Sequence, residues 1–303
     1  MWGRASDSKI IDFPTTRIYL NVPYQQKDSG KAKGARWDAD AKKWYYTNPQ
    51  DADKFTLWME KPFMKYEDLT DEQQELIDRV RAGENVLVDA CIGSGKTSTI
   101  QVLCNEIQNK KILYLTYNNL LKLDAQSKIH QSNTTVTNYH GFANACLNRK
   151  GIRVNPSEMI QEFLKQKPPL GGNYDILILD EYQDIEQEIA EMLEYIKSKN
   201  PQMQIVAVGD MKQKIYDKTT LDVLPFVCSF LGEYTLLSFT KCFRLNEEHA
   251  AYLGGIWEKE INGVNKSCKV EKMNFMEVID VLGNLKPSDI LCLGARTGEM
   301  ADM

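Results

Sequence analysis

The residues of this chain that are best suited to chemistry lie in two short stretches. The first, "ACIGSGKTS" (90–98), places two glycines directly before Lys96 and Thr97. The second, "LILDEYQD" (177–184), is an apolar run that ends in Asp180 and Glu181. Glycines let a backbone wrap around phosphate oxygens, a lysine neutralises phosphate charge, and hydroxyl and carboxylate oxygens suit Mg²⁺. Together they predict phosphate chemistry beside a divalent cation.

The first stretch has the context that a phosphate-binding loop needs. It follows an apolar strand expected at 85–90 and opens a helix expected from residue 96, so the helix amino terminus adds its positive end. A chance glycine-rich turn is the alternative, and the strand, the helix, the lysine and the threonine in one pattern disfavour it. The predicted cofactors are ATP and Mg²⁺. The candidate nucleotide-binding residues are Ala90, Gly93, Ser94, Gly95, Lys96, Thr97 and Ser98.

The adjacent carboxylates of Asp180 and Glu181 can take part in phosphate chemistry if they lie beside the phosphate-binding loop. We expect the strand that ends in Asp180 to lie next to the strand that precedes the loop. Asp180 then binds Mg²⁺ together with Thr97, and Glu181 orients and deprotonates the attacking water. An exposed acidic turn is the alternative for an isolated Asp-Glu pair. Cys91, inside the loop, reads as a filler residue rather than a reactive thiol.

The elements that must position these residues alternate along the chain from residue 69. A helix is expected over 69–83, with Thr70 as N-cap and Gln73 at the capping-box position. Apolar strands are expected at 85–90, 111–117, 134–138, 174–180 and 204–210. Strands that alternate with helices indicate an α/β fold, a parallel sheet with helices on both faces.

The first 62 residues read as a separate small α+β module. Strands are expected at 17–22 and 42–47, with a helical stretch at 27–34 between them. From Arg4 to Lys61 there are eleven Lys and Arg and eight acids, so this part is about +3 in a chain of net charge −5. Basic residues interleaved with aromatics suit nucleic-acid contact. The alternative, which we favour for Trp37 and Trp44, is that the aromatics form the small core.

The length, the cysteine content and the apolar runs of the chain limit the class of protein to which it can belong. The chain has 303 residues, enough for two or three domains, and seven scattered cysteines that read as reduced thiols. The beginning of the sequence lacks a signal-peptide pattern, and no apolar run approaches membrane-spanning length. We expect an intracellular protein of the cytoplasm, the nucleoid or a viral replication site, with no membrane partner.

Several motifs in order resemble those of superfamily 1 DNA helicases of the UvrD/Rep kind. They are "LTDEQQ", "ACIGSGKTS", "YLTYNNLLK", "TVTNYHGFA", "DEYQD", "AVGDMKQKIYD", "KCFRLN" and "DILCLGARTG". The resemblance implies a RecA-like P-loop domain and ATP-driven movement on single-stranded DNA or DNA junctions. The short spacing between residues 147 and 174 favours the F-box-helicase-like or viral/phage-type branch.

The resemblance also implies roles for individual residues. Gln73 is expected to bind the adenine edge, Gln183 and Gln213 to sense the γ-phosphate, and Arg244 to act as an arginine finger from a second domain. Tyr117, Asn118, Thr137 and His140 are expected to contact DNA, and Arg296 stands at an R-T position. Packing residues at strand ends are the alternative for Tyr117 and His140, and a surface ion pair for Arg244.

The chain also departs from that family. "CFR" replaces "NYR", "IYDKTT" (215–220) has no family counterpart, and the last family motifs are missing. We expect a first RecA-like domain at 63–235 and an incomplete second one from 236 to 303, starting near "EYTLLSF". The chain is therefore expected to be a fragment that binds nucleotide and translocates poorly alone. The alternative function is a non-motor P-loop switch that needs a protein partner. A P-loop kinase is disfavoured by the glutamine motifs and the lack of an evident acceptor site.

A second resemblance lies at the amino terminus. "RIYLNVPY", "KGARWD" and "KKWYY" resemble a small uncharacterised module found on DNA-processing and mobile-element proteins. This resemblance implies association with DNA processing more than a defined activity.

Overall fold

The computed structural model describes residues 17–22, 26–55, 58, 64–129, 131–214 and 221–269, together with residues 278 and 281. The chain divides into two compact units, residues 1–64 and 65–303. Arg296 and the motif "DILCLGARTG" lie outside the described residues, as does "IYDKTT". Among the helices of the described ranges, none is long and apolar enough to cross a membrane.

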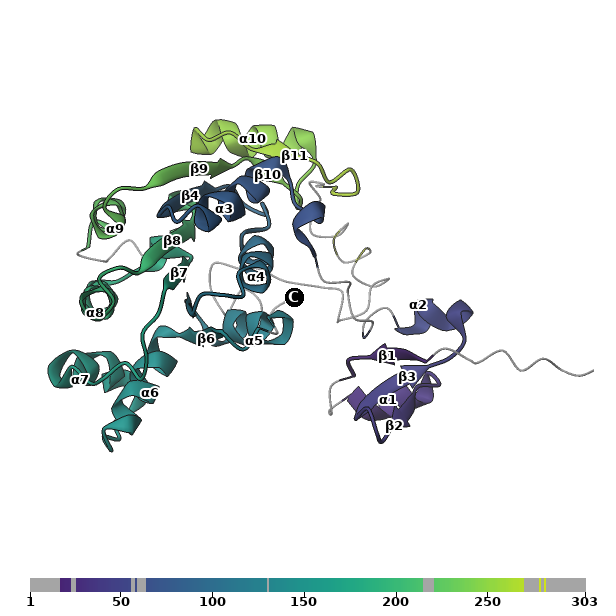
Figure 1. The fold of residues 1–303 in the computed structure, drawn as a ribbon. Helices are drawn as coiled ribbons and strands as arrows, with labels where there is room; N and C mark the ends of the chain where they lie inside the picture. Colours follow the sequence, from purple (N-terminus) through teal and green to yellow (C-terminus); the bar gives the residue numbers. More distant parts are fainter. Residues whose placement is uncertain are drawn as a thin grey trace, which may run out of the picture. The chain divides into compact units, whose positions relative to one another are not determined.

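The first unit is a small α+β module, as expected. Its strands β1 (Ile18–Leu20), β2 (Arg36–Asp38) and β3 (Lys43–Tyr46) form an antiparallel sheet with β3 in the middle (Figure 1). The helices are α1 (Lys27–Ala32) and α2 (Ala52–Phe55). The core consists of Leu20, Ala35, Trp44, Tyr46, Phe55 and Trp58. Trp44 is thus a core residue as favoured above, whereas the side chain of Trp37 is 51% exposed and that interpretation was wrong for it.

The second unit is built on one six-stranded parallel sheet, which confirms the predicted α/β fold with helices on both faces. The strands are β4 (Val86–Ala90), β5 (Ile112–Thr116), β6 (Thr134–Asn138), β7 (Ile176–Asp180), β8 (Gln204–Gly209) and β9 (Thr235–Phe239). Their order across the sheet is β6-β5-β7-β8-β4-β9. Because all the ladders are parallel, the carboxyl ends of these strands meet at one edge of the sheet.

Two separate apolar cores cover the two faces of this sheet. The first is built with α3 (Asp71–Arg81), α4 (Lys96–Glu106) and α5 (Asn119–Lys128). The second is built with α6 (Tyr139–Arg149), α7 (Met159–Gln166), α8 (Gln187–Lys199) and α9 (Val223–Leu231). Figure 1 shows α4 on one side of the strands and α8 with α9 on the other. Strand residues alternate between the two cores, as Tyr114 and Leu115 do, because successive side chains point to opposite faces.

Two expectations about this sheet were wrong. The strand that ends in Asp180, β7, does not lie next to the loop strand β4, because β8 lies between them. The stretch "EYTLLSF" does not open a second α/β unit. It forms β9, which pairs with β4 from Val86↔Thr235 to Ala90↔Phe239 and completes the first sheet. A boundary after residue 235 would cut through this strand.

Beyond β9 the chain stays close to the sheet. A two-residue strand, β10 (Lys241–Cys242), leads into α10 (Glu247–Trp257), and β11 (Asn262–Gly263) returns to pair with β10. Cys91 of the loop packs with Cys242, Ala250 and Ile261 of this segment. The segment therefore belongs to the same packed body as the phosphate loop.

Candidate nucleotide site

The phosphate loop joins β4 to α4 in a conformation that needs its glycines. Gly93 and Gly95 have φ of +66° and +80°, in the left-handed region that other residues rarely adopt. A Cβ at Gly93 would lie 2.6 Å from the Cβ of Arg244, and one at Gly95 would lie 2.9 Å from Nε2 of Gln73. Neighbouring segments therefore press against the loop, and only glycine fits at both positions.

The other candidate residues of the loop take up the expected places. Ala90 ends β4, Ser94 is buried, and Lys96, 7% exposed, is the first residue of α4. Thr97 and Ser98 follow in the first turn of α4 and are partly exposed. The Ser94 hydroxyl is buried with no hydrogen-bond partner among the described residues. Burial raises the pKa of the Cys91 thiol to about 12, which favours the interpretation of Cys91 as a filler residue over that of a reactive thiol.

Gln73 forms the predicted capping box and also touches the loop. Its backbone N–H and side-chain Oε1 exchange hydrogen bonds with Thr70, at 3.4 and 3.0 Å. Its Nε2 donates to the carbonyl oxygen of Ser94 at 2.9 Å. The amide therefore links the start of α3 to the phosphate loop.

The two carboxylates stand at the carboxyl end of β7, across from Lys96. Lys96 Nζ lies 3.6 Å from Glu181 Oε2. Asp180 is fully buried; one of its oxygens accepts from the Tyr114 hydroxyl at 2.7 Å, and the other has no hydrogen-bond partner among the described residues. Burial, together with the charge of Glu181, raises the pKa of Asp180 to about 6. An anionic oxygen left open beside a lysine fits a cation, whose charge would favour the ionised carboxylate.

Glu181 adopts a conformation that is costly for a residue with a side chain. Its φ and ψ are 55° and 54°, in the left-handed region. Such strain persists only where the surroundings hold it, and it collects at functional sites. The strained turn directs the chain from β7 into the 3-10 turn Tyr182–Asp184.

Gln183 and Gln213 both contact Asp210. Gln183 is buried; its Nε2 donates to Glu181 Oε2 at 2.9 Å, and its Oε1 accepts from the backbone N–H of Asp210 at 3.0 Å. Gln213 Nε2 donates to Asp210 Oδ2 at 2.7 Å. A chain of hydrogen bonds therefore runs from Glu181 through Gln183 to the end of β8.

Arg244 lies beside the phosphate loop within the same unit, which corrects the expectation that a second domain supplies it. β9 pairs with β4, so the turn after β9 reaches the same edge of the sheet as the loop. The backbone N–H of Phe243 donates to the carbonyl oxygen of Gly93 at 2.9 Å. Arg244 is exposed, and so is the ring of Phe243, whose carbons come within 3.9 Å of a Cβ built on Gly95.

Lys259 is a residue of this site that sequence reasoning missed. It follows α10, and its Nζ donates to Asp89 Oδ1 at 2.6 Å, to Asp210 Oδ1 at 2.9 Å and to the carbonyl oxygen of Ala90 at 3.2 Å. Burial alone would lower the pKa of Lys259, but its hydrogen bonds to Asp210 and Asp89 outweigh burial and raise it. No motif marks a lysine that is 170 residues from its partner Asp89.

The four residues expected to contact nucleic acid gather at the other end of the same sheet edge. Tyr117 and Asn118 follow β5, and Thr137 lies near the end of the adjacent strand β6, with His140 just beyond it. Asn118 caps α5 by accepting from the backbone N–H of Leu121 at 3.0 Å. His140 is exposed in the first turn of α6. β7 and β8 separate this group from the phosphate loop.

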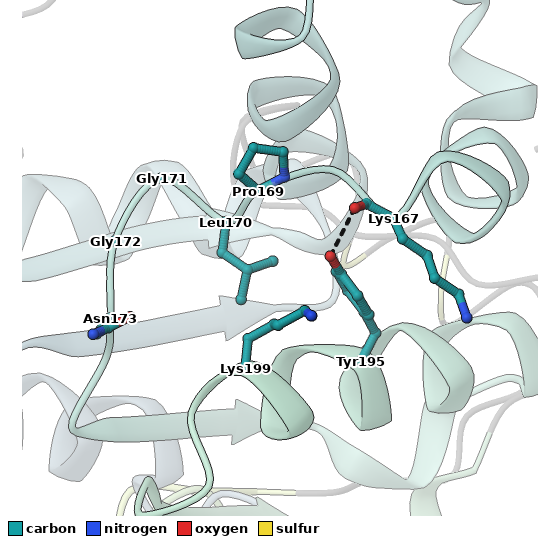
Figure 2. Close-up of a pocket in the computed structure, with 8 residues that line it drawn as sticks. All are labelled: Lys167, Pro169, Leu170, Gly171, Gly172, Asn173, Tyr195 and Lys199. Atoms are coloured by element: carbon teal, nitrogen blue, oxygen red, sulfur yellow. Dashed lines mark hydrogen bonds between the residues drawn. The ribbon is translucent and has the colours of Figure 1, made fainter.

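A cavity of about 580 Å³ elsewhere in this unit is not the nucleotide site. Figure 2 shows it between the loop at 167–173 and α8, with the Tyr195 hydroxyl donating to the carbonyl oxygen of Lys167. The loop runs into β7 from its amino-terminal end. The cavity therefore lies at the opposite end of β7 from Asp180.

Comparison with known families gives two matches. Residues 17–60 match a family described as a domain of unknown function, DUF5710. Residues 73–219 match a family described as an AAA domain. These two ranges follow the two compact units of the structure.

Individual proteins resemble parts of the chain. A 42-residue stretch, 14% of this chain, is 48% identical to 3% of the DNA primase TraC of Escherichia coli. The Pif1 helicase of Bacteroides sp. in complex with ADP-AlF4 is 17% identical, with 61% of this chain and 45% of that chain covered and a TM-score of 0.38. For Pif1 of Candida albicans the identity is 15%, the coverage 63% and 43%, and the TM-score 0.40.

A third solved structure, Bacteroides Pif1 with ADP-AlF3 and single-stranded DNA, is 17% identical, with coverage of 75% and 64% and a TM-score of 0.39. The chain thus spans about half the length of the helicases it resembles and a few per cent of the primase. The match of residues 73–219 to a family described as an AAA domain agrees with the P-loop fold that the motifs of the sequence indicated.

Proposed function

We propose that residues 65–269 bind and hydrolyse ATP with Mg²⁺ and couple hydrolysis to movement along single-stranded DNA, as a superfamily 1 helicase does. The observation that carries the proposal is the arrangement of Lys96, Asp180 and Glu181. A lysine at the amino terminus of α4 faces a strained glutamate at 3.6 Å, and a buried aspartate beside it keeps one oxygen open among the described residues.

The donor set fits Mg²⁺. Asp180 offers a carboxylate oxygen and Thr97 a hydroxyl at the start of α4, and hard oxygen ligands of this kind suit that ion. When bound, the ion would neutralise charge that develops on the phosphates. Glu181 contacts Lys96 and Gln183, and in this proposal it accepts a proton from the attacking water.

The hydrogen-bond chain supports coupling of nucleotide to the rest of the domain. Loss or gain of a phosphate beside Glu181 would change its contacts with Lys96 and Gln183. Gln183 would pass that change to Asp210, and hence to Gln213 and Lys259. Arg244, exposed beside Gly93, is available to stabilise phosphate charge. The exposed ring of Phe243 beside Gln73 and Gly95 offers a flat surface for the base.

The proposal is tested by the rate of ATP hydrolysis with and without single-stranded DNA. We expect DNA to stimulate the wild type and Glu181→Gln to lose about 10²- to 10⁴-fold in kcat, the contribution typical of a general base, while it still binds a fluorescent ATP analogue. Glu186→Gln, a nearby exposed acid, is the matched control and should keep full activity.

The role of the β5–β6 edge is tested separately. His140→Ala should reduce stimulation by DNA and leave the basal rate unchanged, because His140 follows β6, which β5, β7 and β8 separate from the loop strand β4. If Glu181→Gln loses hydrolysis but DNA does not stimulate the wild type, the proposed movement along DNA is refuted. The function that remains is a nucleotide-dependent switch. Undiminished hydrolysis by Glu181→Gln would refute the assignment of the base.

A further inference from the structure

The three-stranded sheet of the first unit has two faces of different character. On one face, Leu20, Trp44 and Tyr46 are buried in the core. On the other face, the register brings Tyr19, Tyr45 and Arg36 into one row across the three strands, because Tyr19 and Arg36 both pair with Tyr45. Tyr19 and Tyr45 are partly exposed and Arg36 is exposed. We call this row, with Arg17 and Lys43, the outer face.

The aromatic rings of the outer face are held in place and do not build the core. Their centroids lie 6.2 Å apart in an edge-on arrangement. The guanidinium of Arg17 lies over the ring of Tyr45, 4.9 Å from its centroid. Two planar groups and a cation therefore stand together at a half-exposed surface.

A buried carboxylate fixes this arrangement. Asp38, 6% exposed, accepts from Arg17 at 2.5 Å and from the Tyr19 hydroxyl at 2.9 Å, and its other oxygen accepts from the backbone N–H groups of Asp40 and Ala41. The carboxylate of Asp38 thus accepts hydrogen bonds from four donors, all of them within the module. Arg17 and Tyr19 are thereby pre-oriented, so little rotamer entropy remains to be lost when a ligand binds.

The segment that carries the outer face is rich in positive charge. Between residues 17 and 58 there are eight Lys and Arg and five Asp, a net charge of +3 within a chain of −5. Arg36 pairs with Tyr45 across the sheet, and Lys43 lies two residues before Tyr45 in β3. Arg36 and Lys43 therefore flank the tyrosine rings, and both side chains are exposed. A polyanion with flat groups between its charges is complementary to this surface.

We propose that the outer face binds single-stranded nucleic acid, with bases stacked on Tyr19 and on the Arg17–Tyr45 pair and phosphates bound by Arg36 and Lys43. Stacking on exposed rings requires bases that are not already stacked in a duplex, which selects a single strand. An acidic peptide could pair with the basic side chains of the outer face but would offer no flat group to stack on the tyrosine rings. This proposal does not depend on the ATPase proposed for the second unit.

The experiment uses the full chain and a 12-nucleotide single strand that carries 5-bromodeoxyuridine. Because the second unit is itself proposed to bind DNA, photo-crosslinks mapped to peptides separate the two sites. We expect crosslinks to the peptides that contain Tyr19 or Tyr45. Crosslinks confined to residues 65–303 would overturn the proposal.

Variants then separate stacking from charge. Tyr45→Ala should weaken binding about 5- to 150-fold, the effect of losing one stacked base, with an unchanged dependence on salt. Tyr45→Phe keeps the ring and should keep the affinity. Arg36→Ala should reduce the slope of log affinity against log salt by about 0.7, as expected for one phosphate contact on a single strand.

Two controls complete the design. Tyr252→Ala removes a 73% exposed tyrosine of the second unit and should leave the module crosslinks unchanged. An abasic strand keeps the phosphates but loses every stacked base, so it should bind at least as weakly as the normal strand binds Tyr45→Ala. Equal binding of the abasic strand, or full displacement by polyglutamate at equal charge, would show that bases are not recognised and would overturn the proposal.

Discussion

Replacing Lys259 by methionine should destabilise the second unit through an unpaired buried charge. Lys259 is the cation that faces Asp210, which is fully buried, and the two atoms that meet, Nζ and Oδ1, are 2.9 Å apart. Removing one partner of a buried ion pair typically costs about 3–5 kcal/mol in the free energy of unfolding. Asp210 keeps its hydrogen bonds from the backbone N–H of Lys212 and from Gln213, so we take the lower end, about 3 kcal/mol. At roughly 2–4 °C per kcal/mol for a domain of this size, Tm should fall by roughly 6–12 °C.

The assay is thermal unfolding followed by far-ultraviolet circular dichroism. Lys266→Met, an exposed lysine in the same segment, is the matched control and should change stability by no more than about 0.5 kcal/mol. Adding Asp210→Asn to Lys259→Met removes the stranded charge and should recover at least half of the loss. A Tm for Lys259→Met within 2 °C of the wild type, or a double variant less stable than the single one, would refute the reasoning from buried charge.

Three further predictions concern the loop, the buried aspartate and the first unit. Gly93→Ala should lower Tm and weaken binding of a fluorescent ADP analogue at least tenfold, because φ is +66° and the new Cβ would lie 2.6 Å from that of Arg244. Gly172→Ala, with open space around it, is the control, and equal binding by both variants would contradict the close packing. Tyr114→Phe removes the hydroxyl that donates to Asp180 and should cost about 1–3 kcal/mol in denaturant unfolding, since a buried carboxylate loses its donor; a loss below 0.5 kcal/mol would contradict this role. The backbone N–H of Ala41, together with Tyr19 and Arg17, lowers the pKa of Asp38 to about 2, so the stabilisation is present above the ordinary pKa near 4 and is lost as the pH falls toward 2. Four of the five tryptophans lie in the first 58 residues, so tryptophan fluorescence should report this acid transition. Asp38→Asn should be less stable at pH 7 and lack the transition. An unchanged acid midpoint in Asp38→Asn would exclude Asp38 as the cause of the transition.

The local features of this protein could be predicted from short stretches of sequence. The capping box of Thr70 and Gln73, the apolar runs that form β4 to β8, and the glycines of the phosphate loop each depend on residues close together in the chain. Parallel pairing followed from the alternation of strands and helices. These features are determined by backbone conformation and burial pattern, which a local sequence encodes.

The lateral order of the strands and the contacts across them were decided only by the tertiary structure. An apolar strand carries no mark of its neighbours, so nothing in "ILILD" or "IVAVG" showed that β8 separates β7 from β4, or that β9 completes the sheet. The same holds for the hydroxyl of Tyr114 on Asp180, for Lys259 beneath Asp89 and Asp210, and for Arg244 against Gly93. The sequence by itself determined which residues could bind phosphate and metal. Their partners depend on packing between distant segments, because a buried charge takes whichever opposite charge or donor the fold brings within reach.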